Sequence, residues 1–323
     1  MIARLGLLAG VLLAAVAVVG CGGTSISSTT TDAPAPKPKK ALPGTGKPLV
    51  TIGDKNYTEQ FVLGELYYQA LSAQGFKVML NRNIGPTEVT LPALQSGRLA
   101  MYPEYLQTWN DTIAGYRHGF PTAFRAYQAG QRYALKHGLE LLTATPFSDT
   151  DAIGVTFNYA TQHRLRSLGD LRRVATTVTL GGPPQLQQSP DGLPAVEQAY
   201  GFQPAAYKPL DIGAQYQALD HGIVQAADVN TTDAELLTGD YRLLADPKHV
   251  FGWGNVVPVA SAKVLDVEGP AFASTVNKVS ALLTLQTMRQ LNAAVEVSHQ
   301  DPSKVAHDFL MAHGLVPPSA PGG

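Results

Sequence analysis

The sequence has 323 residues, and its 24 lysines and arginines are balanced by 25 aspartates and glutamates, which gives a formal net charge of -1 at pH 7. Only 15% of the residues are charged, so the composition argues against a nucleic-acid partner, which would require concentrated positive charge. The chain is longer than one small hydrophobic core usually organises, which predicts two lobes.

The N-terminus has the pattern of a signal peptide over residues 1–20. Arg4 precedes an apolar run from Leu5 to Val19, too short to span a bilayer comfortably, and Gly20 and Cys21 follow. These residues resemble a bacterial lipoprotein lipobox. The resemblance implies cleavage before Cys21, a diacylglycerol on its sulfur, and a protein anchored at the extracytoplasmic face of the cell membrane. An uncleaved transmembrane anchor is the alternative.

Cys21 is the only cysteine of the chain, which excludes an intramolecular disulfide and a multi-cysteine metal site. Residues 21–47 are rich in serine, threonine, proline and lysine. Such a stretch has too little apolar surface to offset the entropy of ordering, so it predicts a flexible tether.

Strands and helices alternate beyond the tether. The first part of the chain predicts a strand at 49–53, a helix capped by Asn56 or Thr58, a strand at 77–80, a short helix at 92–95 and a strand at 99–102. The second part predicts a strand at 152–157, helices at 191–200 and 214–221, and strands at 224–229 and 241–245. The last part predicts a long helix at 270–297, a helix from Asp301 to Gly314 and a frayed tail at 317–323.

This order predicts an α/β protein with two lobes and a cleft between them. Because the terminal helices have no following strand, we expect them to pack back on the first lobe. The chain then crosses between the lobes near 145–151 and again near 250–258. The expected boundaries are 48–147 with 255–316 for the first lobe and 148–254 for the second.

The sequence contains no recognisable catalytic constellation. Its eight histidines show no HExxH spacing, which predicts no zinc site. No serine occupies a Gly-x-Ser-x-Gly elbow, and Gly181-Gly182-Pro183-Pro184 lacks the Gly-Lys-Ser/Thr of a nucleotide-binding loop. We therefore expect no enzyme activity, no metal and no cofactor.

Aromatic residues stand where a cleft would open. Tyr102 and Tyr105 lie at the end of the predicted strand at 99–102 and directly after it. Tyr216 begins a helix of the other lobe, and Trp253 lies between two glycines at the second crossing. Each could equally be a half-buried core residue, but their placement in both lobes favours a binding cleft.

Nine sequence blocks occur in order: Ile52-Gly53-Asp54-Lys55-Asn56-Tyr57-Thr58-Glu59-Gln60-Phe61, Gly85-Pro86-Thr87-Glu88-Val89-Thr90, Ala93-Leu94-Gln95-Ser96-Gly97, Tyr102-Pro103-Glu104-Tyr105, Gly181-Gly182-Pro183-Pro184, Asp191-Gly192-Leu193, Tyr216-Gln217-Ala218-Leu219, Thr231-Thr232-Asp233 and Asp246-Pro247-Lys248-His249-Val250-Phe251-Gly252. Together they resemble the substrate-binding lipoproteins of osmoprotectant ABC importers, which take up glycine betaine, choline, carnitine and related quaternary amines. The resemblance extends from about residue 49 to about residue 316.

The resemblance implies a two-lobed periplasmic-binding-protein fold of type II, with two hinge crossovers. It also implies an extracytoplasmic receptor that closes on a small quaternary-ammonium or zwitterionic solute and delivers it to a membrane permease with a cytoplasmic ATPase. A trimethylammonium group has a diffuse charge and no hydrogen-bond donor, so aromatic faces hold it. A sensory binding module with the same fold is an open alternative.

In the family, tyrosines from both lobes surround the cation, and a lysine and a threonine meet the carboxylate of betaine-like ligands. By this resemblance, Tyr102 is a cage tyrosine, Lys55 the lysine and Thr87 the threonine. Gln60 matches a glutamine of the choline- and carnitine-binding branch. The predicted ligand contacts are therefore Lys55, Gln60, Thr87, Tyr102, Tyr216 and Trp253.

Three positions depart from the family pattern. Many members have an aspartate at Ala100, an aromatic residue at Asn230 and a serine at Pro86. If Asn230 replaces a cage tyrosine, affinity for a simple quaternary amine falls by roughly tenfold or more. Trp253 would then compensate or widen the preference, which leaves a bulkier or aromatic solute as an alternative ligand.

Overall fold

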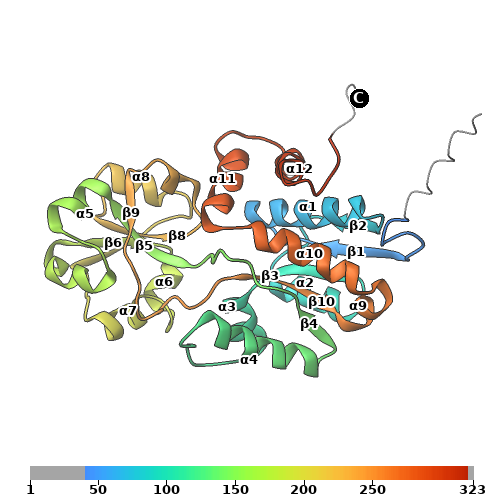
Figure 1. Cartoon of the computed structure of the whole chain (residues 1–323). Coiled ribbons are helices and arrows are strands. Elements are labelled where there is room, and N and C mark those ends of the chain that lie inside the picture. Colours follow the sequence, from blue (N-terminus) through green and yellow to red (C-terminus); the bar gives the residue numbers. More distant parts are fainter. Residues whose placement is uncertain (1–40, 319–323) are drawn as a thin grey trace, which may run out of the picture. The chain divides into compact units, whose positions relative to one another are not determined.

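The computed structural model describes residues 41–318. The predicted signal peptide, the lipidation site Cys21 and most of the predicted tether lie outside this range. The described residues form an α/β structure with two five-stranded sheets, each flanked by helices (Figure 1). No helix between residues 41 and 318 combines the length and the apolar character needed to cross a membrane.

The first lobe is built on a sheet with strand order β2-β1-β3-β10-β4. β1 pairs in parallel with β2 and β3, whereas β10 runs antiparallel between β3 and β4. The strands are β1 (Leu49–Gly53), β2 (Lys77–Asn81), β3 (Met101–Tyr105), β4 (Leu139–Leu141) and β10 (Val256–Ser261). The helices are α1 (Thr58–Ala73), α2 (Thr87–Gln95), α3 (Leu106–Thr108), η1 (Trp109–Ile113), α4 (Ala123–Lys136), α9 (Ala262–Glu268), α10 (Pro270–Leu282), α11 (Leu285–Glu296) and α12 (Pro302–Ala312).

The second lobe repeats this plan with strand order β7-β6-β8-β5-β9. β6 pairs in parallel with β7 and β8, and β5 runs antiparallel between β8 and β9. The strands are β5 (Asp151–Thr156), β6 (Thr179–Gly182), β7 (Ala206–Pro209), β8 (Ala226–Asn230) and β9 (Tyr241–Leu243). The helices are α5 (Phe157–His163), η2 (Leu168–Arg173), η3 (Ala175–Thr177), α6 (Pro184–Gln188), α7 (Leu193–Tyr200), α8 (Gln215–Asp220) and η4 (Ala234–Leu237).

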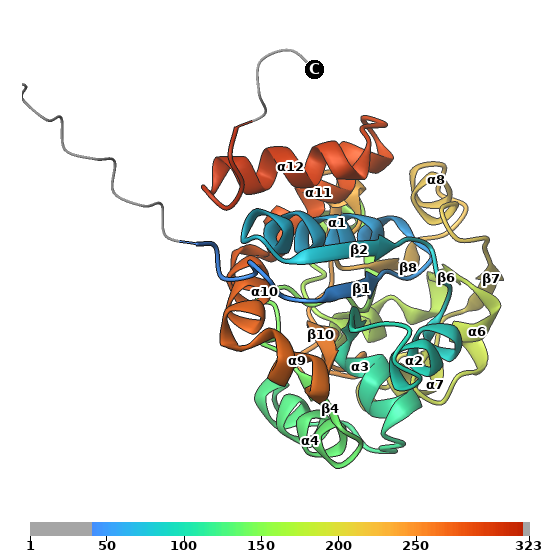
Figure 2. The same cartoon turned by 90° about the vertical axis from the view of Figure 1, so that its right-hand side faces the viewer.

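Each lobe has its own hydrophobic core. In the first lobe, α1 lies between the sheet and helices α11 and α12 (Figure 2), which explains why it is apolar on most sides rather than along one stripe. Val62, Leu63 and Leu66 of this helix are fully buried. Ile153 and Phe202 belong to the separate core of the second lobe. The helix α7 in that lobe ends at Tyr200, where the predicted helix ends, and Gly201 follows in a left-handed conformation.

Two crossover segments, 142–150 and 244–255, join the lobes and pair with each other. Ser148 forms an isolated antiparallel bridge with Asn255, and the Asp149 backbone N–H donates to the Gly254 carbonyl over 3.0 Å. A Cβ atom at Gly254 would lie 1.7 Å from the Asp149 carbonyl oxygen, so the close pairing requires glycine there. The structure thus contains the two predicted crossovers as a hydrogen-bonded ribbon.

Helix α11 makes a third connection between the lobes. Arg289 donates from Nε to the Thr231 carbonyl over 2.8 Å, and Asn292 donates from Nδ2 to the Thr232 carbonyl over 3.2 Å. Both acceptors follow β8 of the second lobe, and α11 packs against η4 beside them. A helix of the first lobe is therefore attached to the second lobe next to the crossovers.

The predicted single helix over 270–297 is wrong. The structure contains α10 and α11 instead, separated at Leu283, whose backbone is extended at φ -85° and ψ 82°. The Leu283 carbonyl accepts a hydrogen bond of 3.1 Å from Phe147 of the first crossover, and Thr284 caps α11 through its side chain. The predicted helix at 92–95 is also too short, because α2 begins at Thr87.

Candidate functional site: the cleft between the lobes

Three adjoining cavities occupy the cleft between the lobes. The central cavity has a volume of about 390 Å³, and it shares Tyr57, Asp149 and Asn230 with a hinge-side cavity of about 400 Å³. It shares Gln107 and Asp191 with an outer cavity of about 580 Å³. The hinge-side cavity also contacts α11 through Asn292 and Glu296, so the cleft runs from α11 through the central cavity to the outer one.

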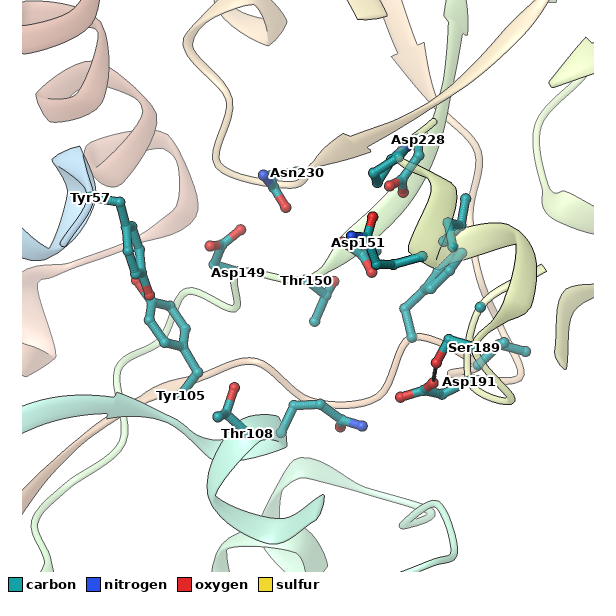
Figure 3. A pocket seen from close by; sticks show the side chains of 17 residues that line it. Tyr57, Tyr105, Thr108, Asp149, Thr150, Asp151, Ser189, Asp191, Asp228 and Asn230 are labelled. Atoms are coloured by element: carbon teal, nitrogen blue, oxygen red, sulfur yellow. Dashed lines mark hydrogen bonds between the residues drawn. The ribbon is translucent and has the colours of Figure 1, made fainter. Parts of the chain in front are cut away.

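Two tyrosines of the first lobe form one wall of the central cavity. Tyr57 immediately precedes α1, and Tyr105 is the last residue of β3. Their rings stack with centroids 5.9 Å apart and an interplanar angle of 29°. Tyr105 is 6% exposed and donates its hydroxyl to Glu59 Oε1 over 2.7 Å, whereas Tyr57 is 39% exposed. Figure 3 shows both rings on the same side of the cavity.

Carboxylates of the second lobe and of the first crossover form the facing wall (Figure 3). Asp151 begins β5 and pairs in register with Asn230 at the end of β8, while Asp228 lies two residues earlier on β8. Asp191 comes from the loop between α6 and α7 and accepts a hydrogen bond from Ser189. Burial, with help from Asp151, raises the pKa of Asp228 to about 8. Burial also raises the pKa of Asp151.

The hinge-side cavity is acidic as well. Burial raises the pKa of Glu59, although hydrogen bonds from Asn292 and Tyr105 oppose this effect. Burial, followed by the charge of Glu59, raises the pKa of Asp149. At the other side of this cavity Tyr216 donates its hydroxyl to Asp233 Oδ2 over 2.8 Å.

Three of the predicted ligand contacts come together around Glu104, which is fully buried. The Lys55 ammonium forms an ion pair with Glu104 and donates to Thr87 Oγ1 over 2.8 Å. Thr87 and Tyr102 donate their hydroxyls to Glu104 Oε2 over 3.0 and 3.2 Å. The side chain of Tyr102 is fully buried. None of Lys55, Thr87 and Tyr102 is among the described residues that line the three cleft cavities.

The other three predicted contacts are apart from one another. Gln60 is fully buried and accepts a long hydrogen bond of 3.4 Å from the Lys55 backbone. Tyr216 lines the hinge-side cavity from the second lobe. Trp253 donates its indole N–H to the Phe120 carbonyl over 2.8 Å and packs at the edge of the first lobe's core. The ligand-binding roles of all six residues stay predictions.

None of the six predicted ligand contacts is among the described residues that line the central cavity. Tyr105 had a usable signal, because it ends a strand of a sheet whose parallel part opens at that edge, and Tyr57 follows β1 at the same edge. Asp149 and Asp151 flank the expected first crossing, but isolated aspartates form no motif. Asp228 lies inside a buried strand, where nothing in the sequence indicates which face borders the cleft.

Comparison with known proteins finds relatives over most of the chain. A family model described as the substrate-binding domain of the ABC-type glycine betaine transport system matches residues 48–312. A glycine-betaine-binding protein of Pseudomonas aeruginosa is 30% identical over 278 residues, which cover 82% of this chain and 88% of the relative. The glycine betaine-binding protein YehZ of Escherichia coli is 30% identical over 292 residues, covering 85% of this chain and 93% of the relative.

Solved structures show the same fold. The chain is similar to apo YehZ from Escherichia coli with a TM-score of 0.71 and 30% identity, over 83% of this chain and 99% of the other. It is also similar to a structure described as a glycine betaine/carnitine/choline ABC transporter, with a TM-score of 0.77 and 24% identity, over 82% of this chain and 99% of that one. Both likenesses cover the two lobes and the cleft between them.

Proposed function

The chain belongs to the family of substrate-binding domains of ABC-type glycine betaine transport systems, and from this premise we propose that it captures a small quaternary-ammonium solute in the interlobe cleft for import. The solute class is that of glycine betaine, choline and carnitine. The loaded protein delivers its solute to a membrane permease driven by a cytoplasmic ATPase.

The observation that carries this proposal is the stacked pair Tyr57 and Tyr105 facing carboxylates across the central cavity. A quaternary ammonium group binds the negative face of an aromatic ring, worth roughly 0.5 to 2 kcal/mol per good contact. Carboxylates on the opposite wall add the counter-charge that a permanent cation needs after it leaves water.

The location follows from the predicted lipoprotein signal. We propose that the mature chain begins at Cys21, carries lipid on that residue and works outside the cytoplasmic membrane, with residues 22–47 as the tether. We further propose that it binds and releases its solute without chemical change, so that it is not an enzyme.

Calorimetry with choline and its neutral isostere 3,3-dimethylbutan-1-ol tests the proposed function. The two molecules have nearly the same shape, but only choline carries the charge. Saturable binding of choline or glycine betaine, with no binding of the neutral isostere, is the expected result. If neither quaternary amine binds at millimolar concentration, or if the isostere binds as well as choline, the proposal is wrong.

A further inference from the structure

The charged side chains among the described residues that line the central cavity are all acidic. Four aspartates line it, at positions 149, 151, 191 and 228, and no lysine or arginine is found among the described residues that do so. The hinge-side cavity adds Glu59, Asp233, Glu235 and Glu296, again with no basic residue among its described lining residues. A solute in these two cavities therefore meets acidic side chains on the second lobe and along the crossover, whereas the basic residues Arg117, His118 and His249 line the outer cavity.

Two of these carboxyl groups each have one oxygen without a hydrogen-bond partner among the described residues. Asp228 is only 7% exposed, and its Oδ1 has no hydrogen-bond partner among the described residues. The same holds for Oδ1 of Asp149. A buried polar atom without a partner is costly unless a ligand satisfies it. Figure 3 shows Asp228 and Asp151 on the same wall of the cavity, which both residues line.

The carboxylates do not form a metal site. Within residues 41–318, no group of three or more histidines, cysteines, aspartates or glutamates is arranged to hold a metal ion. The aspartates are instead spread along one wall, opposite the stacked rings of Tyr57 and Tyr105. This arrangement suits an organic cation, whose charge is spread over several methyl groups.

Lys55, the lysine predicted to contact the ligand's carboxylate, already forms an ion pair within the protein. Lys55 is 4% exposed, and its ammonium pairs with Glu104, which is fully buried and also accepts hydrogen bonds from Thr87 and Tyr102. Breaking one partner of a buried ion pair leaves the other charge uncompensated at high cost. The ammonium is thus neutralised inside the first lobe, behind the wall of the cleft.

From this arrangement we infer that the cleft selects a quaternary cation without a carboxylate, of the choline type, over a zwitterion such as glycine betaine. The inference rests on the proposed function and narrows its ligand. Aspartates 151 and 228 are the specificity-determining residues. They attract the ammonium group of either solute, but they repel the carboxylate that only the zwitterion carries.

Competitive calorimetry with choline and glycine betaine at pH 8.5 and fixed ionic strength tests the inference. We expect the wild-type protein to bind choline at least about tenfold more tightly. The double variant Asp151→Asn/Asp228→Asn should bind choline about tenfold less tightly and glycine betaine little changed, so that the preference is lost. Asp266→Asn is the control for the loss of an acidic side chain, because it removes one carboxylate from the exposed face of α9 and should leave the ratio unaltered.

Two outcomes overturn the inference while leaving the proposed function intact. One is a wild-type protein that binds glycine betaine as tightly as choline or more tightly. The other concerns the double variant Lys55→Met/Glu104→Gln, which removes both charges of the buried ion pair. If this variant loses tenfold more affinity for glycine betaine than for choline, Lys55 contacts the ligand's carboxylate in the wild-type protein. Failure of both solutes to bind wild-type protein would instead refute the proposed function itself.

Discussion

At the scale of single residues, the cleft combines an aromatic wall with an acidic one. Tyr57 is held in place by stacking on Tyr105, which is itself fixed by its hydrogen bond to Glu59. The ring of Tyr57 remains partly exposed to the cavity, so its face is available without any rearrangement of the core. An aromatic ring fixed in this way contributes binding energy at a small cost in conformational entropy.

Substitution of Tyr57 separates the ring face from the hydroxyl group. Tyr57→Phe should keep most of the affinity for a quaternary amine, and Tyr57→Ala should lose about 1 to 2 kcal/mol of binding free energy, because the ring face carries the attraction. Isothermal titration calorimetry measures both. Phe124→Ala is the control, since Phe124 is an exposed aromatic residue on α4. Equal affinities for Tyr57→Ala and the control would place the cation elsewhere in the cleft.

The raised pKa of Asp228, about 8, makes solute binding depend on pH. The charged groups that act on Asp228 are Asp151 and Asp233, both acidic. Below pH 8 the free protein holds a proton on Asp228, and a bound cation favours the ionised form and expels that proton. Affinity should therefore rise with pH by up to about tenfold per unit and level off above pH 8.

The carboxyl group of Asp228 has the opposite effect on the stability of the free protein, which should fall as the pH rises. Because its pKa lies above the unfolded value of 3.8, the folded state binds more protons between about pH 4 and pH 8, and the stability from this group falls as pH rises through that window. Thermal melts and titrations between pH 5 and pH 9 measure both trends. Asp228→Asn should flatten each of them, and unchanged slopes in that variant would rule out Asp228 as their source.

At the scale of elements, the hinge depends on how closely the two crossovers pair. Gly254 has no room for a side chain beside the Asp149 carbonyl, and its backbone N–H donates to Ser148 Oγ over 2.9 Å. Gly254→Ala should force the two segments apart and lower the free energy of unfolding by about 2 kcal/mol. Chemical denaturation measures this loss. Gly119→Ala, where a Cβ meets nothing within 4 Å, is the control, and equal loss in both variants would contradict the expectation.

Helices and strands can be predicted from the sequence where local residue patterns determine their bounds, but poorly where tertiary contacts determine them. The first strand has the predicted bounds, because a short apolar run between polar residues determines it. The break between α10 and α11 was missed, because a hydrogen bond to Phe147 and the burial of Leu283 cause it. The apolar periodicity continues through the break.

The residues of the candidate site are also hard to predict from local sequence patterns. Lys55, Thr87 and Tyr102 lie together around Glu104, and their roles in ligand binding stay predictions. All five residues of β3 are buried, so alternation cannot show which side chains face the cleft. The position of Glu104 determines where these side chains lie, because Lys55, Thr87 and Tyr102 all bond to its buried carboxylate. A buried counter-charge of this kind has no sequence signature.

At the scale of the whole molecule, the proposed membrane attachment depends on Cys21, which lies outside the described residues. Cys21→Ser should leave an unprocessed precursor or release the protein from membranes, because it removes the proposed acylation site. Incorporation of radiolabelled lipid and membrane fractionation measure this. Thr24→Ser, a conservative change in the neighbouring tether, is the control. Equal lipid incorporation in Cys21→Ser and the control would end the lipoprotein interpretation.

The attachment of α11 to the second lobe limits how the lobes can move. A ribbon of two strands alone leaves the joined bodies free to bend and to twist, but Arg289 and Asn292 hold the second lobe at an additional point beside the ribbon. Bodies tied along a line keep one rotational degree of freedom. The outer cavity shares no lining residue with the hinge-side cavity, and residues of both lobes, among them Arg117 and Asp191, line it. A rotation about that line changes the separation of Arg117 on the first lobe and Asp191 on the second, so a membrane partner that contacts both residues can distinguish a loaded protein from an empty one.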